Sequence, residues 1–114
     1  PNAKQKARLI EFVRLVEKAD EATFAKEIGN YLDIDAFMKF LAMSTLVGNM
    51  DSILTLGHNY YLYLSPENNK FYFFPWDADL SFGNFFVGGN PAQQADLSID
   101  HPQQGDHKLI DRLV

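Results

Sequence analysis

The hydrophobic pattern of the chain changes its period once, near Gly48. Before this glycine, apolar residues recur three and four positions apart, as they do on one face of an α-helix. After it, two short runs rich in aromatic residues are separated by a turn, as in paired β-strands. One such change within 114 residues predicts an α+β fold with no more than one domain.

The first half of the chain predicts three helices, over residues 4–18, 21–31 and 33–47. In the first helix, a stripe of apolar residues at helical spacing predicts the buried face: Leu9, Phe12, Val13 and Val16. Asp20 and Asp33 are suitable N-cap residues for the second and third helices, and Gly48 is a stop signal for the third. The third helix has almost no polar face, so we expect it to be central and buried.

The second half of the chain predicts an antiparallel hairpin. Residues 59–64 and 70–76 are the expected strands, and the turn 65–69 contains proline and two asparagines. We interpret the aromatic residues of both strands as core packing rather than as a stacking surface. Residues 84–106 show no period and predict a long loop, and a further helix begins near His107.

The charge and composition of the chain exclude several classes of function. A net charge of −5 without a basic cluster argues against a nucleic-acid surface, which needs Lys and Arg to neutralise phosphates. No apolar run approaches the roughly 20 residues that span a bilayer, and we expect no signal peptide within this sequence. The chain has no cysteine, which excludes disulfides but does not identify the compartment. A secreted or surface-associated parent protein therefore stays open.

Three polar residues flank the predicted hairpin and suggest a chemical site. Asp51 precedes the hairpin, Asn59 stands at its entrance and Asp77 at its exit. Because a hairpin brings its two ends together, we expect Asn59 and Asp77 to share one end of the ribbon. Carboxylate and amide oxygens are the ligands that Mg²⁺ prefers. A further carboxylate, Asp51, could orient a hydroxyl nucleophile and accept its proton.

The order Asp, Asn, hairpin, Asp resembles the catalytic centre of protein kinases. The sequence is more closely similar to the spore coat protein H (CotH) kinase family, through GNMDS at 48–52, HNYYLY at 58–63 and PWDADLSFG at 75–83. The segments 31–37 and 108–113 are also similar to that family. Ala78 is a mild departure, since the family usually has a larger aliphatic residue there.

The resemblance implies specific roles for these residues. Asp51 would be the catalytic carboxylate, while Asn59 and Asp77 would hold Mg²⁺ (or Mn²⁺) against the phosphates of ATP. Asp79 would be a second metal ligand, or it would support the metal ligands without contacting the metal itself. The acceptor would be a Ser or Thr hydroxyl on a protein substrate. Residues 1–114 would then form a partial domain, a helical kinase-like C-lobe fragment with a buried central helix, a hairpin and a long loop.

The nucleotide-clamping half of a kinase is not found in the sequence. It has no Gly-x-Gly-x-x-Gly loop and no strand-borne lysine suited to ATP phosphates. We therefore expect these residues to be insufficient for activity in isolation, and to self-associate through the apolar surface left uncovered.

Two other functions stay open. Asp77-Ala-Asp79 also fits the Asp-x-Asp that holds Mn²⁺ and a nucleotide sugar in glycosyltransferases, although the helical first half does not favour the α/β sandwich that such sites use. A non-catalytic module with a kinase-like fold, acting in cell-surface or spore-coat adhesion, is the third reading.

Overall fold

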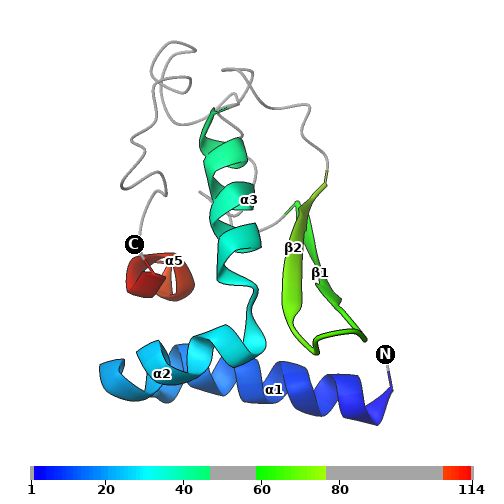
Figure 1. Cartoon of the computed structure of the whole chain (residues 1–114), viewed down its shortest axis with the longest axis vertical. Coiled ribbons are helices and arrows are strands. Elements are labelled where there is room, and N and C mark those ends of the chain that lie inside the picture. Colours follow the sequence, from blue (N-terminus) through cyan, green and yellow to red (C-terminus); the bar gives the residue numbers. More distant parts are fainter. Residues whose placement is uncertain (1, 47–58, 77–106, 114) are drawn as a thin grey trace.

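The computed structural model describes residues 2–46, 59–76 and 107–113. They form helices α1 (Ala3–Lys18), α2 (Glu21–Tyr31) and α3 (Ile34–Leu46), strands β1 (Tyr60–Leu64) and β2 (Phe71–Pro75), and helix α5 (Lys108–Leu113). In Figure 1, α1 and α2 lie side by side at one end, α3 rises from them, and the hairpin and α5 flank α3 on opposite sides. This arrangement confirms the α+β prediction. The long loop predicted over 84–106 lies outside the described residues.

Side-chain caps explain where the first three helices begin. Asn2 and Gln5 form a reciprocal capping box, in which each side chain accepts the backbone N–H of the other at 2.9 Å. Asp20 and Asp33 each accept the N–H of the residue three positions on, at 2.7 and 3.0 Å. Both aspartates were predicted as caps, and their role is confirmed.

The buried face of α1 is rotated from the predicted one. Phe12, Leu15 and Val16 are buried, whereas Leu9 and Val13 are 38% and 49% exposed. The apolar stripe of α1 is wider than the surface that its neighbouring elements cover. Helices α2 and α5 pack against α1 and, by the burial pattern, cover the Leu15 side of the stripe.

The hairpin is antiparallel, with Tyr60 opposite Pro75 and Leu64 opposite Phe71. Successive side chains of a strand point to opposite faces. On the inner face Phe71 and Phe73 are buried, as predicted. The prediction of core packing is wrong for the aromatic residues of the outer face, which are between 40% and 51% exposed: Tyr61, Tyr63 and Phe74.

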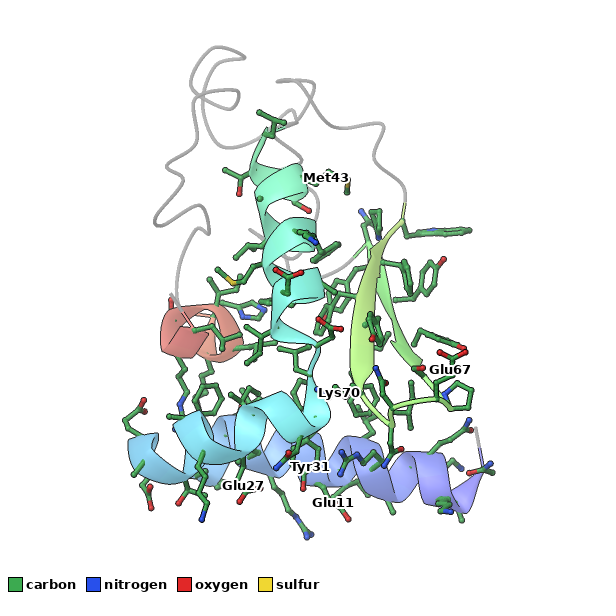
Figure 2. All side chains as sticks on the ribbon, in the orientation of Figure 1. Glu11, Glu27, Tyr31, Met43, Glu67 and Lys70 are labelled. Atoms are coloured by element: carbon green, nitrogen blue, oxygen red, sulfur yellow. The ribbon has the colours of Figure 1, made fainter. Side chains whose placement is uncertain are left out.

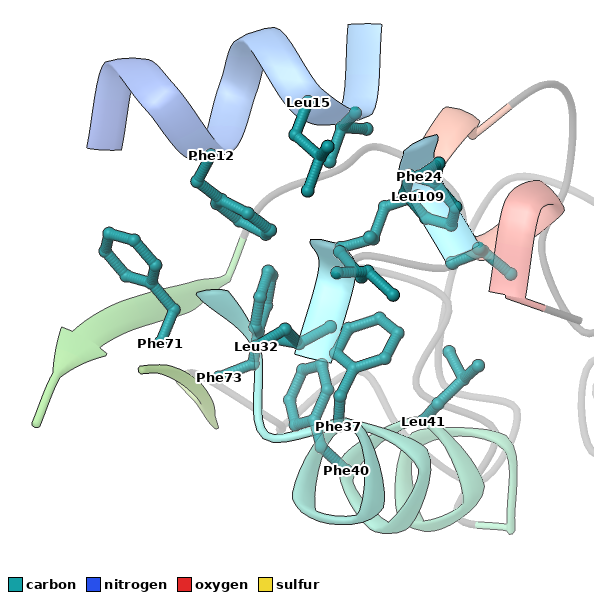
Figure 3. Close-up of a cluster of buried hydrophobic side chains, with 13 residues drawn as sticks. Phe12, Leu15, Phe24, Leu32, Phe37, Phe40, Leu41, Phe71, Phe73 and Leu109 are labelled. Carbon is teal, nitrogen blue, oxygen red and sulfur yellow. The ribbon is translucent and has the colours of Figure 1, made fainter. Parts of the chain in front are cut away.

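The core lies where α1, α3 and the inner face of the hairpin meet (Figure 3). Phe12 of α1 stacks on Phe71 with ring centroids 5.1 Å apart. Phe73 packs edge-to-face on Phe37 of α3 at 4.9 Å. Two aromatic contacts of this kind fix the hairpin against both helices.

The link between α2 and α3 also holds the hairpin. Leu32 is fully buried and forms a parallel bridge with Phe71 of β2. The next residue, Asp33, caps α3 and accepts the hydroxyl hydrogen of Tyr72 at 2.9 Å. One short segment therefore positions α3 relative to the sheet.

Helix α3 is buried on one face only. Phe37, Phe40 and Leu41 are buried, in agreement with the prediction of a central helix. The opposite face is exposed to solvent, with Met43 at 42% and Leu46 at 82% (Figure 2). The apolar composition of this helix therefore exceeds what the described elements cover.

Candidate functional site

Asn59 lies at the open end of the hairpin, one residue before β1. Its φ is +57°, in the left-handed region that asparagine tolerates better than most residues. Its backbone carbonyl accepts the N–H of Trp76 at 2.8 Å. The predicted position of Asn59 at the hairpin entrance is thus confirmed. Asp77 lies outside the described residues, but it follows in sequence directly on the residue to which Asn59 is bonded.

Aromatic rings line the outer face of the hairpin up to this end. Trp76 packs edge-to-face on Tyr61 at 6.3 Å, and Tyr61 stacks on Phe74 at 5.6 Å. Trp76 remains 65% exposed. The described residues therefore leave this face of the open end in contact with water.

Helix α3 approaches the same end of the molecule from the other side. In Figure 1, its last turn and the open end of the hairpin point in the same direction. Ser44 and Thr45 in that turn are buried, and the Thr45 hydroxyl donates to the carbonyl of Leu41 at 2.8 Å. Asp51 follows Leu46 by five positions in the sequence and lies outside the described residues.

Of the four predicted site residues, the structure therefore describes Asn59. Asp51, Asp77 and Asp79 lie outside the described residues, and their grouping stays a prediction. The described chain shows that the elements which lead into Asp51 and Asp77 end on the same side as Asn59.

Two carboxylates elsewhere in the described structure, those of Asp20 and Asp33, have structural partners. The N–H of Ala36 and the Tyr72 hydroxyl lower the pKa of Asp33, since both donate to its ionised carboxylate. The N–H of Thr23 likewise lowers the pKa of Asp20. Within residues 2–46, 59–76 and 107–113, no three His, Cys, Asp or Glu side chains gather as a metal site. These carboxylates therefore do not offer an alternative centre.

One polar group was not anticipated from the sequence. The Tyr72 hydroxyl lies between Asp33 and Asn68, receiving a hydrogen bond from the Asn68 amide at 2.7 Å. The alternation of β2 predicts only the face that Tyr72 occupies. Its partner is 39 positions away, and no local pattern signals it.

No helix in the described parts of the chain is long and apolar enough to cross a membrane. The prediction that the chain has no membrane span is consistent with this finding.

Comparison with known proteins gives the family. The model of the family described as CotH kinase protein matches residues 2–114. The inner spore coat protein H of Bacillus subtilis (strain 168) is 32% identical over 73 residues, which are 64% of this chain. The chain spans 19% of the length of that relative. The family model covers nearly every residue, including Asn59 and the hairpin. The chain therefore belongs to the CotH kinase protein family.

Proposed function

We propose that this chain carries the catalytic aspartate and the metal ligands of an ATP- and Mg²⁺-dependent phosphotransferase that modifies Ser or Thr on protein substrates. The observation that carries the proposal is the open end of the hairpin. There Asn59, in a left-handed conformation, is bonded to Trp76, and α3 ends on the same side. Membership of the CotH kinase protein family supports the same reading.

The donor set fits a hard divalent cation. Asn59 offers an amide oxygen, and Asp77 and Asp79 offer carboxylate oxygens, the ligand types that Mg²⁺ and Mn²⁺ take. When bound, such a cation neutralises the phosphate charge of ATP. We assign Asn59 and Asp77 to hold it, with Asp79 as a further ligand or a support for the first two.

We assign Asp51 to orient and deprotonate the acceptor, which is the Ser or Thr hydroxyl of the protein substrate. As the Ser or Thr oxygen attacks the γ-phosphorus, its proton passes to the Asp51 carboxylate, and ADP leaves with the electron pair of the broken bond. The free hydroxyl is a weak nucleophile, so a carboxylate that orients it and takes its proton contributes directly to the rate.

These residues are proposed to need a nucleotide-binding part that they do not contain. The sequence has no glycine-rich phosphate loop, and the chain corresponds to 19% of the length of its curated relative. Transfer activity is therefore assigned to the longer parent protein rather than to these residues alone.

The test is transfer of labelled γ-phosphate by the parent protein, to itself and to a serine-rich protein. We expect Asp51→Ala to abolish transfer while nucleotide binding is retained, and Asp77→Asn to abolish divalent-dependent nucleotide binding as well. Asp35→Asn is the matched control, because Asp35 is exposed and ion-paired with Lys39 at 2.9 Å. Normal transfer by both site variants would contradict the assigned roles.

A non-catalytic interaction module is the second candidate. The exposed aromatic residues on the outer face of the hairpin favour it, since such surfaces commonly mark protein contacts. The curated relative is named as a spore coat protein, which also suggests a place in an assembly. Wild-type parent protein that binds no nucleotide, with or without a divalent cation, would support this candidate over the kinase.

A further inference from the structure

Asn59 and Trp76 are the outermost described residues at the open end of the hairpin. The Trp76 N–H donates to the Asn59 carbonyl at 2.8 Å. Tyr60 and Pro75 form the next pair, and Pro75 has no N–H to donate. The ends of a two-stranded sheet open readily, because backbone hydrogen bonds alone hold such a sheet only marginally. The hydrogen bond between residues 59 and 76 therefore depends on support from side chains.

A row of aromatic rings on the outer face of the hairpin gives this support. Phe74 and Trp76 lie two positions apart, so their side chains leave the chain on the same face. Trp76 packs edge-to-face on Tyr61 with ring centroids 6.3 Å apart. Tyr61 in turn stacks on Phe74 at 5.6 Å, and Phe74 meets Tyr63 at 6.3 Å. Trp76 is thus the ring at the open end of the row, and its contact with Tyr61 reaches across to β1.

The inner face of the hairpin is held separately at the same end. There Tyr60 stacks on Phe73 with ring centroids 5.2 Å apart, and Phe73 is a core residue with 8% of its surface exposed. Trp76, in contrast, is 65% exposed. The contact between Trp76 and Tyr61 can therefore be removed by substitution while the packing of the inner face on the core is kept.

The backbone of Asn59 makes the state of this end relevant to the candidate site. Its φ of +57° lies in the left-handed region, which a non-glycine residue keeps only where its surroundings hold it. This angle sets the direction in which the Asn59 side chain leaves the backbone. The carbonyl of the same residue is bonded to Trp76. Loss of that bond would release the backbone of Asn59 and the direction of its amide together.

We propose that Trp76 is a positioning residue, whose ring contact with Tyr61 keeps the 59–76 hydrogen bond formed and so holds the Asn59 amide ready for the divalent cation. This inference rests on the proposed function, which assigns Asn59 to the metal. Trp76 acts through Asn59 and contacts no reactant. Its loss therefore affects the affinity for the cation and not the rate of transfer once the cation is bound.

The first test is the rate of γ-phosphate transfer by the parent protein, measured against free Mg²⁺ at saturating ATP. Trp76→Ala should raise the Mg²⁺ concentration at half-maximal rate by about threefold to tenfold, the equivalent of one aromatic pair, while the maximal rate is retained. Trp76→Phe keeps a ring at this position and should restore most of the affinity. Tyr63→Ala is the matched control, because Tyr63 also packs edge-to-face on the outer face, at 6.3 Å from Phe74. Circular dichroism would verify that the variants fold.

A double-mutant cycle tests the route through Tyr61. Tyr61→Ala should shift the Mg²⁺ dependence as Trp76→Ala does, and the double variant should add little further shift, because either change removes the same contact. Additive shifts would overturn the proposal. An unchanged Mg²⁺ dependence with a higher requirement for ATP would overturn it too, since the ring would then contact the nucleotide itself.

The second test does not depend on activity. Hydrogen exchange of the residue 76 amide in the parent protein should be faster in Tyr61→Ala than in the wild type, and unchanged in Tyr63→Ala. Unchanged exchange in Tyr61→Ala, in a parent protein that transfers phosphate with Mg²⁺, would overturn the positioning role and leave the proposed function standing. A wild type without Mg²⁺-dependent transfer or nucleotide binding would overturn the proposed function, and with it the role of Asn59 on which this inference rests.

Discussion

The guanidinium of Arg112, on α5, caps the C-terminal end of α1. Its two terminal nitrogens donate to the carbonyls of Leu15, Val16 and Ala19 at 3.2, 2.7 and 2.7 Å. The last carbonyls of a helix mostly lack a backbone donor, although the Leu15 carbonyl also accepts the N–H of Ala19 at 3.4 Å. A cation there also meets the negative end of the helix dipole. The same group lies 4.1 Å above the ring of Phe24 on α2. One side chain thus joins α1, α2 and α5.

We expect Arg112→Lys to lower the free energy of unfolding by about 1–3 kcal/mol. Lysine keeps the charge but has one nitrogen, and it cannot reproduce the planar fork that serves three carbonyls. Urea denaturation followed by circular dichroism measures the change. Arg14→Lys on the exposed side of α1 is the control. Equal stability of the two variants would show that the hydrogen bonds of Arg112 contribute little.

We expect His107 to make the start of α5 sensitive to pH. Its Nδ1 accepts the N–H of Ile110 at 3.4 Å, and only a neutral imidazole nitrogen can do so. Burial lowers the pKa of His107 below its usual 6.5. The unfolded chain therefore binds the proton more readily, and stability should fall as the pH drops below about 6.5. The measurement that checks this is the urea midpoint of unfolding between pH 7 and pH 5. We expect the midpoint to vary less with pH in His107→Asn than in the wild type. An identical pH dependence in this variant would assign the effect to other groups.

Strand β2 is tied to the segment that links α2 to α3. Asp33 begins α3, while the Tyr72 hydroxyl of β2 donates to its carboxylate. Arg8 of α1 adds a further tie, donating to the carbonyl of Asn69 in the hairpin turn at 3.2 Å. The hairpin is thus fixed through its closed end, and its open end extends toward the candidate site.

Removal of the Tyr72 hydroxyl should loosen this connection. Tyr72→Phe deletes one hydrogen bond to a charged acceptor and should reduce the free energy of unfolding by about 1 kcal/mol. Tyr63→Phe is the comparison, because Tyr63 lies on the same face of the hairpin and is 48% exposed. Thermal unfolding of both variants measures the difference. If Tyr63→Phe lowers the free energy of unfolding as much as Tyr72→Phe does, the hydrogen bond to Asp33 does not stabilise this connection.

The sequence predicts the elements well because their signals are local. Asp20 and Asp33 mark helix starts through side chains that reach only three residues along the chain. The rotation of the α1 face was not predictable, since periodicity shows an apolar stripe but not which side its neighbours cover. For the site, the prediction of Asn59 at the hairpin entrance holds for the same local reason. The placement of Asp51 beside Asn59 stays a prediction, because Asp51 lies outside the described residues and no local pattern in one sequence fixes the distance between separate segments.

At the scale of the whole molecule, Phe73 joins the hairpin to the helices. Its ring centroid lies 4.9 Å from that of Phe37, 5.9 Å from that of Phe40 and 5.2 Å from that of Tyr60. Figure 3 shows it between β2 and α3. With 8% of its surface exposed, it is a core residue shared by both halves of the fold.

Phe73→Ala should therefore cost about 3–5 kcal/mol, through lost burial and the cavity left behind. A loss of this size is a large part of the total stability of a small domain. The neighbouring Phe74→Ala is an internal control, because Phe74 is 40% exposed on the opposite face. Hydrogen exchange of the β1 and β2 amides would follow the hairpin directly. Equal protection in the two variants would refute the assignment of Phe73 as the link.

The closure of α1 by Arg112 has a consequence for biosynthesis. The carbonyls of Leu15 and Val16 obtain their guanidinium partner 97 and 96 residues later in the chain. A ribosome delivers these residues in order, so α1 emerges long before the residue that completes it. The nascent chain must keep the end of α1 hydrated until α5 has left the exit tunnel. We therefore expect the final docking of α1 to be a late event in synthesis, although α1 is the first of the described helices to be made.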